Sequence, residues 1–374
     1  MTNPFLIKGY LSKEFFCNRV EELKELERNV KNGIDTTLIS ARRLGKTGLI
    51  MRLFEGLKGE PFELIYVDIY ASRTQSDFIK LLIEAILKKI PPKTTIGKNF
   101  FSLLKSLRPV ISYDPISGEP QITISYQTAV EKEYTLQGIL DFLEQHPQKI
   151  VLAIDEFQQI TEYPEKNTES ILRTYMQHLQ NIRFIFCGSD KRMMTDIFSN
   201  VKHPFFASTQ FLNLGKINRD QYAVFIKDSF ARNGKHITDE AVDLILDWSK
   251  TYTFYTQSVC NMTFSISGKN SDIETVKKAC IALLKQGETV YLQYRKLLTP
   301  GQWNYLIAVA KEDVVRKITA QSFITRYDIG TPANSRRLLK ALLEKELLLE
   351  IQETHAVSYQ VYDVFFSRWL QMEY

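Results

Sequence analysis

The stretch that decides the fold is TLISARRLGKTGLI, residues 37–50. It begins with β-branched and apolar residues typical of a buried strand, crosses a short loop, and continues from Lys46 with the apolar spacing of a helix. Gly-Lys-Thr at the start of that helix matches the end of the phosphate-binding pattern G-x-x-x-x-G-K-[ST]. At the first position of the pattern, Ser40 replaces glycine. The stretch predicts a nucleotide-binding α/β domain whose loop departs from the pattern at one position.

The residues of the loop explain how phosphate would be bound. Backbone N–H groups that converge at a helix N-terminus attract anions, and Gly45 has no side chain to block that approach. Lys46 would bring positive charge to the outer phosphates, and Thr47 would bind Mg²⁺ through its hydroxyl oxygen. A left-handed backbone at Ser40 would cost about 1 kcal/mol. The predicted binding segment comprises Ser40, Ala41, Arg42, Arg43, Leu44, Gly45, Lys46, Thr47 and Gly48.

A second motif lies at VLAIDE, residues 151–156. Four apolar residues end in two adjacent carboxylates, so a buried parallel strand would deliver Asp155 at its carboxyl end, where open α/β sheets bind ligands. Asp155 would hold Mg²⁺ through water, and Glu156 would orient and activate the attacking water. The alternative is an ordinary strand followed by a solvated acidic turn. Two motifs in the expected order, each on the expected element, favour the nucleotide site.

A third polar position follows the apolar run FIFCG, where Ser189 and Asp190 end a further predicted strand. A side chain at this place would contact the γ-phosphate or the attacking water, which makes Ser189 a candidate catalytic residue. Either residue would equally serve as the N-cap of the next helix. The two interpretations stay open, and one residue can fulfil both.

The organisation of the whole chain fits this site. Strands alternate with helices through the first half, which predicts a parallel sheet flanked by helices on both faces. At about 108–128, two β-rich segments around a Pro/Gly turn predict an inserted β-hairpin. After residue 215 the strand signal gives way to helices. We therefore expect an α/β core at 1–215, a helical domain at 216–296, and a third module of three helices and a hairpin at 297–374.

Composition restricts the class of protein. Hydrophobic residues make up 44% and charged residues 24% of the 374 positions, as in soluble globular proteins of two or three domains. No apolar run reaches the roughly 18–20 residues of a membrane helix, and the N-terminus lacks signal-peptide features, so a cytoplasmic location without membrane association is expected. The net charge of +5 permits nucleic-acid binding without arguing for it. The four widely spaced cysteines are expected to be buried thiols.

With these motifs, the chain resembles the archaeal-type ATPases of the AAA+/STAND group, which are related to replication-initiation ATPases. The resemblance implies ATP as the nucleotide, and it makes Phe16 and Arg19 candidates for contact with the adenine base. Asn18 departs from the glycine that is usual between them. The segments that carry the resemblance are FCNRVEELKEL (16–26), SARRLGKT (40–47), VLAIDEFQ (151–158) and CGSD (187–190).

Two departures from this family bear on catalysis. Relatives often carry an arginine near the end of HPFFAS (203–208), where Ser208 stands here, and Arg173 and Arg192 are alternatives. Without that arginine, hydrolysis would be slow unless a partner supplies one. The lid segment YTFYTQSVCN (252–261) lacks the family's glycine and proline, which puts nucleotide contacts from the lid in doubt.

The C-terminal module resembles a winged helix-turn-helix, whose third helix enters the DNA major groove. In that case Ser335, Arg336, Arg337 and Lys340 would face DNA. The module is close to neutral, whereas strong DNA binders show a basic surface, so a contact with protein is the open alternative.

The predicted function is an ATP-binding and ATP-hydrolysing molecular switch of the AAA+/STAND type, with ATP and Mg²⁺ as cofactors. Glu156, Lys46 and Ser189 are the catalytic candidates, and the helical lid domain couples nucleotide state to the winged helix. A protein partner or self-association would receive the output. The alternative is a nucleotide-binding scaffold or DNA-binding regulator with little or no turnover, which Ser40, Ser208 and the altered lid favour. A DNA-stimulated ATPase is a third possibility.

Overall fold

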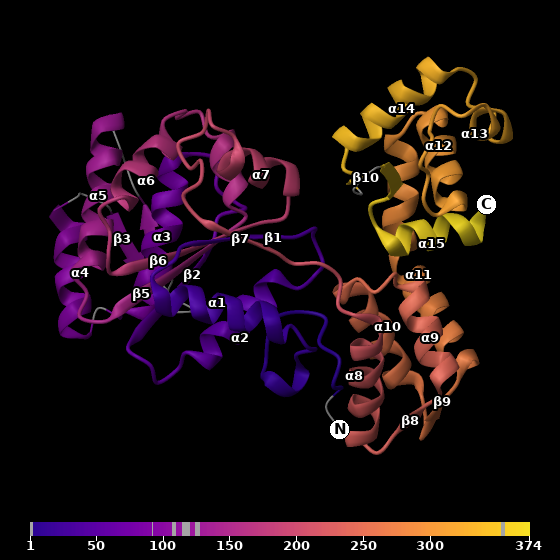
Figure 1. Ribbon diagram of the computed structural model, residues 1–374, viewed down its shortest axis with the longest axis horizontal. Coiled ribbons are helices and arrows are strands. Elements are labelled where there is room, and N and C mark those ends of the chain that lie inside the picture. The colour runs from indigo at the N-terminus through magenta and orange to yellow at the C-terminus, as the bar shows by residue number, and fades with distance from the viewer. Residues whose placement is uncertain (1–2, 92, 107–109, 114–119, 124–127, 353–355) are drawn as a thin grey trace. The chain divides into compact units, whose positions relative to one another are not determined.

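The computed structural model describes residues 3–91, 93–106, 110–113, 120–123, 128–352 and 356–374. The chain divides into two compact units. One is Lys8–Lys216, and the other combines Met1–Ile7 with Ile217–Tyr374 (Figure 1). Each unit has its own buried core and is described separately. No helix in the described ranges combines the length and the apolar character needed to cross a bilayer.

The first unit is built on a five-stranded parallel sheet with the order β2-β5-β6-β1-β7. Its central strands are buried on both faces, which explains why they read as continuous apolar runs. The predicted parallel sheet is confirmed. Its strands are β1 (Thr36–Ile39), β2 (Phe62–Asp68), β5 (Lys149–Asp155), β6 (Ile182–Gly188) and β7 (Gln210–Asn213).

Helices cover both faces of this sheet because side chains alternate along each strand. Val151 and Ala153 of β5 share a buried cluster with α1 (Val20–Asn32) and α2 (Lys46–Gly56). Leu152 and Ile154 point into a larger cluster on the opposite face, which these helices cover: α3 (Gln75–Lys89), α4 (Thr95–Ser106), α5 (Ala129–Glu144), α6 (Thr168–Met176) and α7 (Lys191–Ser199). Figure 1 shows α1 and α2 on one side of the strands and α3 to α6 on the other.

The insertion contains the predicted hairpin strands. β3 (Val110–Tyr113) pairs antiparallel with β4 (Pro120–Thr123), from Val110 opposite Thr123 to Tyr113 opposite Pro120. The predicted turn between them lies outside the described residues.

The second unit contains the helices of the predicted lid domain, called the lid below, followed by the winged helix. The lid comprises α8 (Arg219–Arg232), β8 (His236–Ile237), α9 (Asp239–Trp248), α10 (Thr253–Ile266), β9 (Asn270–Ser271) and α11 (Ile273–Leu297). The order of elements after it is that of a winged helix, with antiparallel wing strands: α12 (Pro300–Glu312), α13 (Gln321–Arg326), α14 (Pro332–Glu344), β10 (Leu348–Gln352), β11 (Val357–Val361) and a last helix, α15 (Val364–Glu373). The division of this unit at residue 297 stays a prediction.

The N-terminal residues differ from the sequence prediction, which placed them in the core at 1–215. Phe5 is 1% exposed and packs between α8 and α10, with its ring centroid 5.4 Å from that of Phe230 and 6.2 Å from that of Phe264. The Asn261 amide donates a hydrogen bond of 2.7 Å to the Phe5 carbonyl. Burial of an aromatic ring therefore assigns this segment to the lid.

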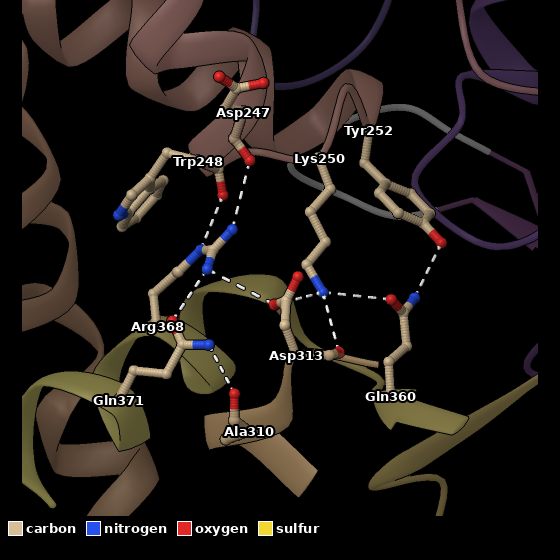
Figure 2. Close-up of polar contacts among 9 residues, drawn as sticks. All are labelled: Asp247, Trp248, Lys250, Tyr252, Ala310, Asp313, Gln360, Arg368 and Gln371. Atoms are coloured by element: carbon tan, nitrogen blue, oxygen red, sulfur yellow. Dashed lines mark hydrogen bonds and ion pairs between the residues drawn. The ribbon is translucent and has the colours of Figure 1, made fainter. Parts of the chain in front are cut away.

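A polar network joins the lid to the winged helix (Figure 2). Lys250, which follows α9, places its Nζ 2.8 Å from Asp313 Oδ1 and donates to Gln360 Oε1 at 3.2 Å. Arg368 of α15 donates to the Trp248 carbonyl at 3.1 Å and lies 3.5 Å from the same Asp313 oxygen. Two cations from different elements thus converge on one carboxylate at the end of α12.

Candidate functional site

The loop between β1 and α2 takes its unusual backbone at positions other than the one the pattern implies. Arg43 and Gly45 are left-handed, with φ of 70° and 93°, and Ser40 is not among the described residues with positive φ. The prediction of a left-handed, strained backbone at Ser40 is therefore wrong. Ser40 is buried, and its hydroxyl donates to the Ala41 carbonyl at 2.9 Å. A small polar residue fits this position without a backbone penalty.

Lys46, the first residue of α2, has a side chain suited to bind an anion. It is only 7% exposed, yet no hydrogen bond or ion pair within the described part of the chain engages its ammonium group. Gly45 precedes it as the N-cap and contributes no side-chain cap to the first N–H groups of the helix. A buried cation beside free N–H groups fits phosphate.

Thr47 and Asp155, the two predicted metal ligands, meet directly. The Thr47 hydroxyl donates to Asp155 Oδ2 at 3.0 Å, although the two residues lie far apart in the sequence. The backbone N–H of Glu156 donates to Asp155 Oδ1 at 3.0 Å. A hydroxyl and a carboxylate at this spacing form a donor set of the oxygen type that Mg²⁺ prefers. These residues, together with Lys46, fit a magnesium–nucleotide complex.

Two residues of β2 belong to this site although the sequence analysis did not single them out. Tyr66 donates its hydroxyl to Asp155 Oδ2 at 2.8 Å, and burial raises its pKa above the usual range, which keeps it a donor. Asp68 lies opposite Asp155 in the strand register. Burial raises the pKa of Asp68, and the carboxylates of Asp155 and Glu156 add to the effect. The available signal was two polar residues, Tyr66 and Asp68, in the carboxyl-terminal half of the strand.

Glu156 is held at the end of β5 by donors from two elements. It has a left-handed backbone with φ of 57°, and its Oε2 accepts from the Ser189 hydroxyl at 2.5 Å. The Gln158 amide donates to the same oxygen at 2.6 Å. Arg42 Nε in turn donates to the Ser189 hydroxyl oxygen at 3.2 Å. The loop, the end of β6 and the acidic motif thus form one connected network.

Ser189 and Asp190, the two residues after β6, have different roles: one contacts the site and the other caps a helix. Ser189 contacts Glu156, whereas the Asp190 side chain caps α7 by accepting from the Met193 N–H at 2.9 Å.

Phe16 lies beside the start of α2. A Cβ on Gly48 would lie 3.6 Å from the Phe16 ring, so glycine leaves the aromatic ring close to the loop helix. The Tyr10 ring meets Phe16 edge-on at 5.8 Å. Contact between Phe16 and a nucleotide base stays a prediction.

Arg19 is placed behind the loop. Its guanidinium is buried and donates to the carbonyls of Leu44 at 3.2 Å and Gly215 at 2.7 Å. Asn18 and Arg19 both have left-handed backbones, with φ of 55° and 65°. Asparagine tolerates this conformation, which explains how it replaces the family's glycine. Base contact by Arg19 stays a prediction, and the observed role of Arg19 is to brace the loop.

Ser208, which stands where relatives often carry an arginine, makes a local hydrogen bond to the backbone. The Ser208 hydroxyl donates to the Phe205 carbonyl at 2.7 Å in the turn before β7. Arg173 lies on α6 and Arg192 is exposed on α7. The source of a catalytic arginine stays a prediction.

The third helix of the winged helix, α14, differs from the prediction at one residue. Arg336, Arg337 and Lys340 are exposed, as a DNA-facing surface requires. Ser335 is buried instead, and its hydroxyl donates to the Ile318 carbonyl at 2.6 Å. The helical period explains the correction, because Ser335 shares its face with Leu338, Leu339 and Leu342, which are all buried.

The sequence matches two family profiles. One is described as an ATPase domain predominantly from Archaea and covers residues 16–251, well over half of the chain. The chain belongs to this family. The second is described as a probable winged helix domain and covers residues 289–372. No curated protein matches the chain in sequence. The family supports a nucleotide-binding ATPase, and the matched residues 16–251 include the loop at 40–48 and the motif at 151–156.

Solved structures agree on the fold. A Walker-type ATPase of Pyrococcus abyssi is similar over 98% of this chain and 99% of its own, with 18% identity and a TM-score of 0.66. The ORC2 protein of Aeropyrum pernix, solved with ADPNP and ADP, is similar over 99% of this chain and 98% of its own, with 14% identity and a TM-score of 0.60. The ORC1 protein of the same organism, solved with DNA, is similar over 96% of this chain and 93% of its own, with 11% identity and a TM-score of 0.53. The chain thus has a P-loop AAA+ fold with a C-terminal winged helix.

Proposed function

We propose that this protein is an ATP-binding and ATP-hydrolysing molecular switch of the AAA+/STAND type. The observation that carries the proposal is the hydrogen bond between Thr47 and Asp155, because it brings the phosphate loop and the acidic motif into one site. Lys46 supports it, since its side chain is buried and its ammonium makes no ion pair with the described residues.

Each residue has a distinct role in the proposed reaction. Lys46 and the N–H groups of the loop hold the outer phosphates, and Thr47 and Asp155 hold Mg²⁺. When bound, Mg²⁺ neutralises negative charge on the phosphate oxygens. Glu156 accepts a proton from the attacking water, which makes the water a better nucleophile. Ser189 keeps the Glu156 carboxylate in place while the proton moves.

The switch would act through the second unit. The network of Lys250, Asp313 and Arg368 ties the lid to the winged helix, so a movement of the lid would carry the winged helix with it. We place the output at the winged helix, toward a protein partner or a second copy of the chain. A partner would also be able to supply the arginine that is missing at Ser208.

The test is Mg²⁺-dependent ATP turnover by the full chain beside Lys46→Ala and Glu156→Gln, with ATP affinity measured by calorimetry. We expect both variants to lose turnover, Lys46→Ala because it no longer binds ATP and Glu156→Gln because it binds ATP without cleaving it. Tight ATP binding by the wild type with no turnover, alone or with added partner, would instead establish the nucleotide-binding scaffold.

A second candidate function is DNA binding by α14. It is favoured by the exposed cations Arg336, Arg337 and Lys340 and by the fold shared with an ORC1 protein solved with DNA. Lys340 lies 3.9 Å from Glu344, which offsets part of this charge. Duplex DNA binding that weakens with salt and is lost in Arg336→Ala/Arg337→Ala would support this function. Turnover that rises with the same duplex would make the protein a DNA-stimulated ATPase.

A further inference from the structure

We infer that Gln158 is a positioning residue for Glu156, holding its carboxylate so that one oxygen remains available to the attacking water. The inference rests on the proposed hydrolysis. Gln158 does not touch the reacting atoms in this scheme and acts only through Glu156.

The hydrogen bonds around Glu156 are distributed unequally between its two oxygens. Oε2 accepts from both Gln158 Nε2, at 2.6 Å, and the Ser189 hydroxyl, at 2.5 Å. No hydrogen bond from the described part of the chain reaches Oε1. Two donors on one oxygen set the direction of the carboxylate plane and leave the lone pairs of the other oxygen open.

The two donors come from elements that are fixed independently. Ser189 directly follows β6, and Arg42 of the loop donates to its hydroxyl oxygen, which leaves the hydroxyl proton for Glu156. Gln158 lies on the 3₁₀ helix η2 (Phe157–Glu162). The left-handed backbone of Glu156 turns the chain at this point, and the Gln158 amide returns to the carboxylate two residues before it.

Within the described structure, the Gln158 side chain makes one hydrogen bond, the one to Glu156. Its side chain is 7% exposed, and its Oε1 is buried without a hydrogen-bond partner in the described structure. A Cβ on Gly188 would lie 2.5 Å from that oxygen, so the amide needs the absence of a side chain there. Buried amides that serve only packing normally have both ends paired. In Gln158 the side-chain oxygen is unpaired and the side-chain NH₂ is paired. We therefore take its donation to Glu156 to be the function of this side chain.

The test compares Gln158→Leu and Gln158→Glu with Gln159→Leu and Gln159→Glu in the full chain. Gln159 is the matched control, because it is the next residue of η2 and its side chain makes no hydrogen bond in the described structure. We measure kcat and KM for ATP, the Kd for ATP with Mg²⁺, and Tm. For Gln158→Leu we expect kcat to fall about 10- to 100-fold, since a displacement of about 1 Å has this effect, with Kd nearly unchanged.

The split between kcat and Kd separates a positioning role from a general loss of structure, because a misfolded site would also bind ATP less tightly. Gln158→Glu removes the amide donor at nearly the same side-chain size, so kcat should fall in this variant too. Gln159→Leu and Gln159→Glu should leave kcat, Kd and Tm close to the wild-type values.

The outcomes separate the two proposals. Wild-type turnover with an unchanged kcat in Gln158→Leu, or a fall in kcat that Gln159→Leu reproduces, would overturn the role of Gln158 and leave the ATPase intact. A wild-type chain that binds ATP and never cleaves it would refute the proposed function, and the role of Gln158 with it.

Discussion

Neutralising Asp313 should loosen the connection between the lid and the winged helix. Lys250 is 9% exposed, and its ammonium lies 2.8 Å from Asp313 Oδ1. Burial lowers the pKa of Lys250, and the Asp313 carboxylate opposes that effect. In Asp313→Asn the buried ammonium keeps only neutral acceptors, such as Gln360 Oε1 at 3.2 Å. Its solvation cost is then no longer offset by an opposite charge.

The size of the effect follows from the burial of the two partners. Removing one partner of a fully buried ion pair costs about 3–5 kcal/mol. The Asp313 side chain is 43% exposed, so water screens the pair and we expect about 1–2 kcal/mol for Asp313→Asn. Asp313→Ala should cost about 1 kcal/mol more, because φ is 60° at this residue and asparagine tolerates that conformation better. Lys250→Met should cost less, since it removes the buried charge itself.

The sign of the pH dependence provides a further check. A lysine whose pKa is lowered by folding penalises the folded state at neutral pH, and the penalty disappears as pH rises and the amine deprotonates. Loss of the carboxylate lowers the pKa of Lys250 further. The stability difference between Asp313→Asn and the wild type should therefore shrink as pH rises from 7 toward 10.

Hydrogen exchange measured by mass spectrometry on the full chain suits this prediction, because a chain of two units does not unfold in a single step. Peptides covering residues 244–256 and 308–316 should exchange faster in Asp313→Asn. Glu274→Gln, which removes an exposed ion pair with Lys277, is the control and should change neither peptide. Additive effects of Asp313→Asn and Lys250→Met in the double variant would refute the reasoning, since coupled partners cannot be additive.

Three further predictions test other parts of the chain. Phe5→Ala should destabilise the lid by about 3–5 kcal/mol through loss of its aromatic contacts, seen as a lower Tm of that unit in calorimetry; an unchanged scan would contradict the N-terminal packing. Burial raises the pKa of Asp35 to about 6, so the folded state favours the protonated carboxyl. The free energy of unfolding should therefore decrease as pH rises through 6 and Asp35 ionises. Asp35→Asn, which can still accept from the Phe184 N–H, should exceed the wild type in stability at pH 8 by up to about 3 kcal/mol and match it near pH 4 in urea unfolding; equal curves at both pH values would refute this. Asn18→Ala should lower stability by about 1 kcal/mol more than Asn18→Gly does, because φ is 55° there; the reverse order would contradict the role of the left-handed backbone.

Much of the fold could be predicted because its signals are local. The loop at residues 40–48 and the strand before Asp155 are each contained in one short segment, and chain order alone requires parallel strands when helices alternate with them. The hairpin strands and the winged helix are also local patterns of alternation and helical period. Parallel strands have their carboxyl ends at one edge, so Thr47, Asp155 and Ser189 could be assigned to one site before any distance was known.

The remaining features depend on which strands become neighbours and which faces are covered. Tyr66 and Asp68 enter the site because β2 pairs with β5, a choice that no local pattern in either strand specifies. Gln158 reaches Glu156 because the chain turns sharply between them, and Ser335 is buried because α14 packs with that face inward. Local sequence determines periodicity and backbone preference, whereas these contacts are set by the burial of apolar surface over the whole unit, to which residues far apart in the chain contribute together.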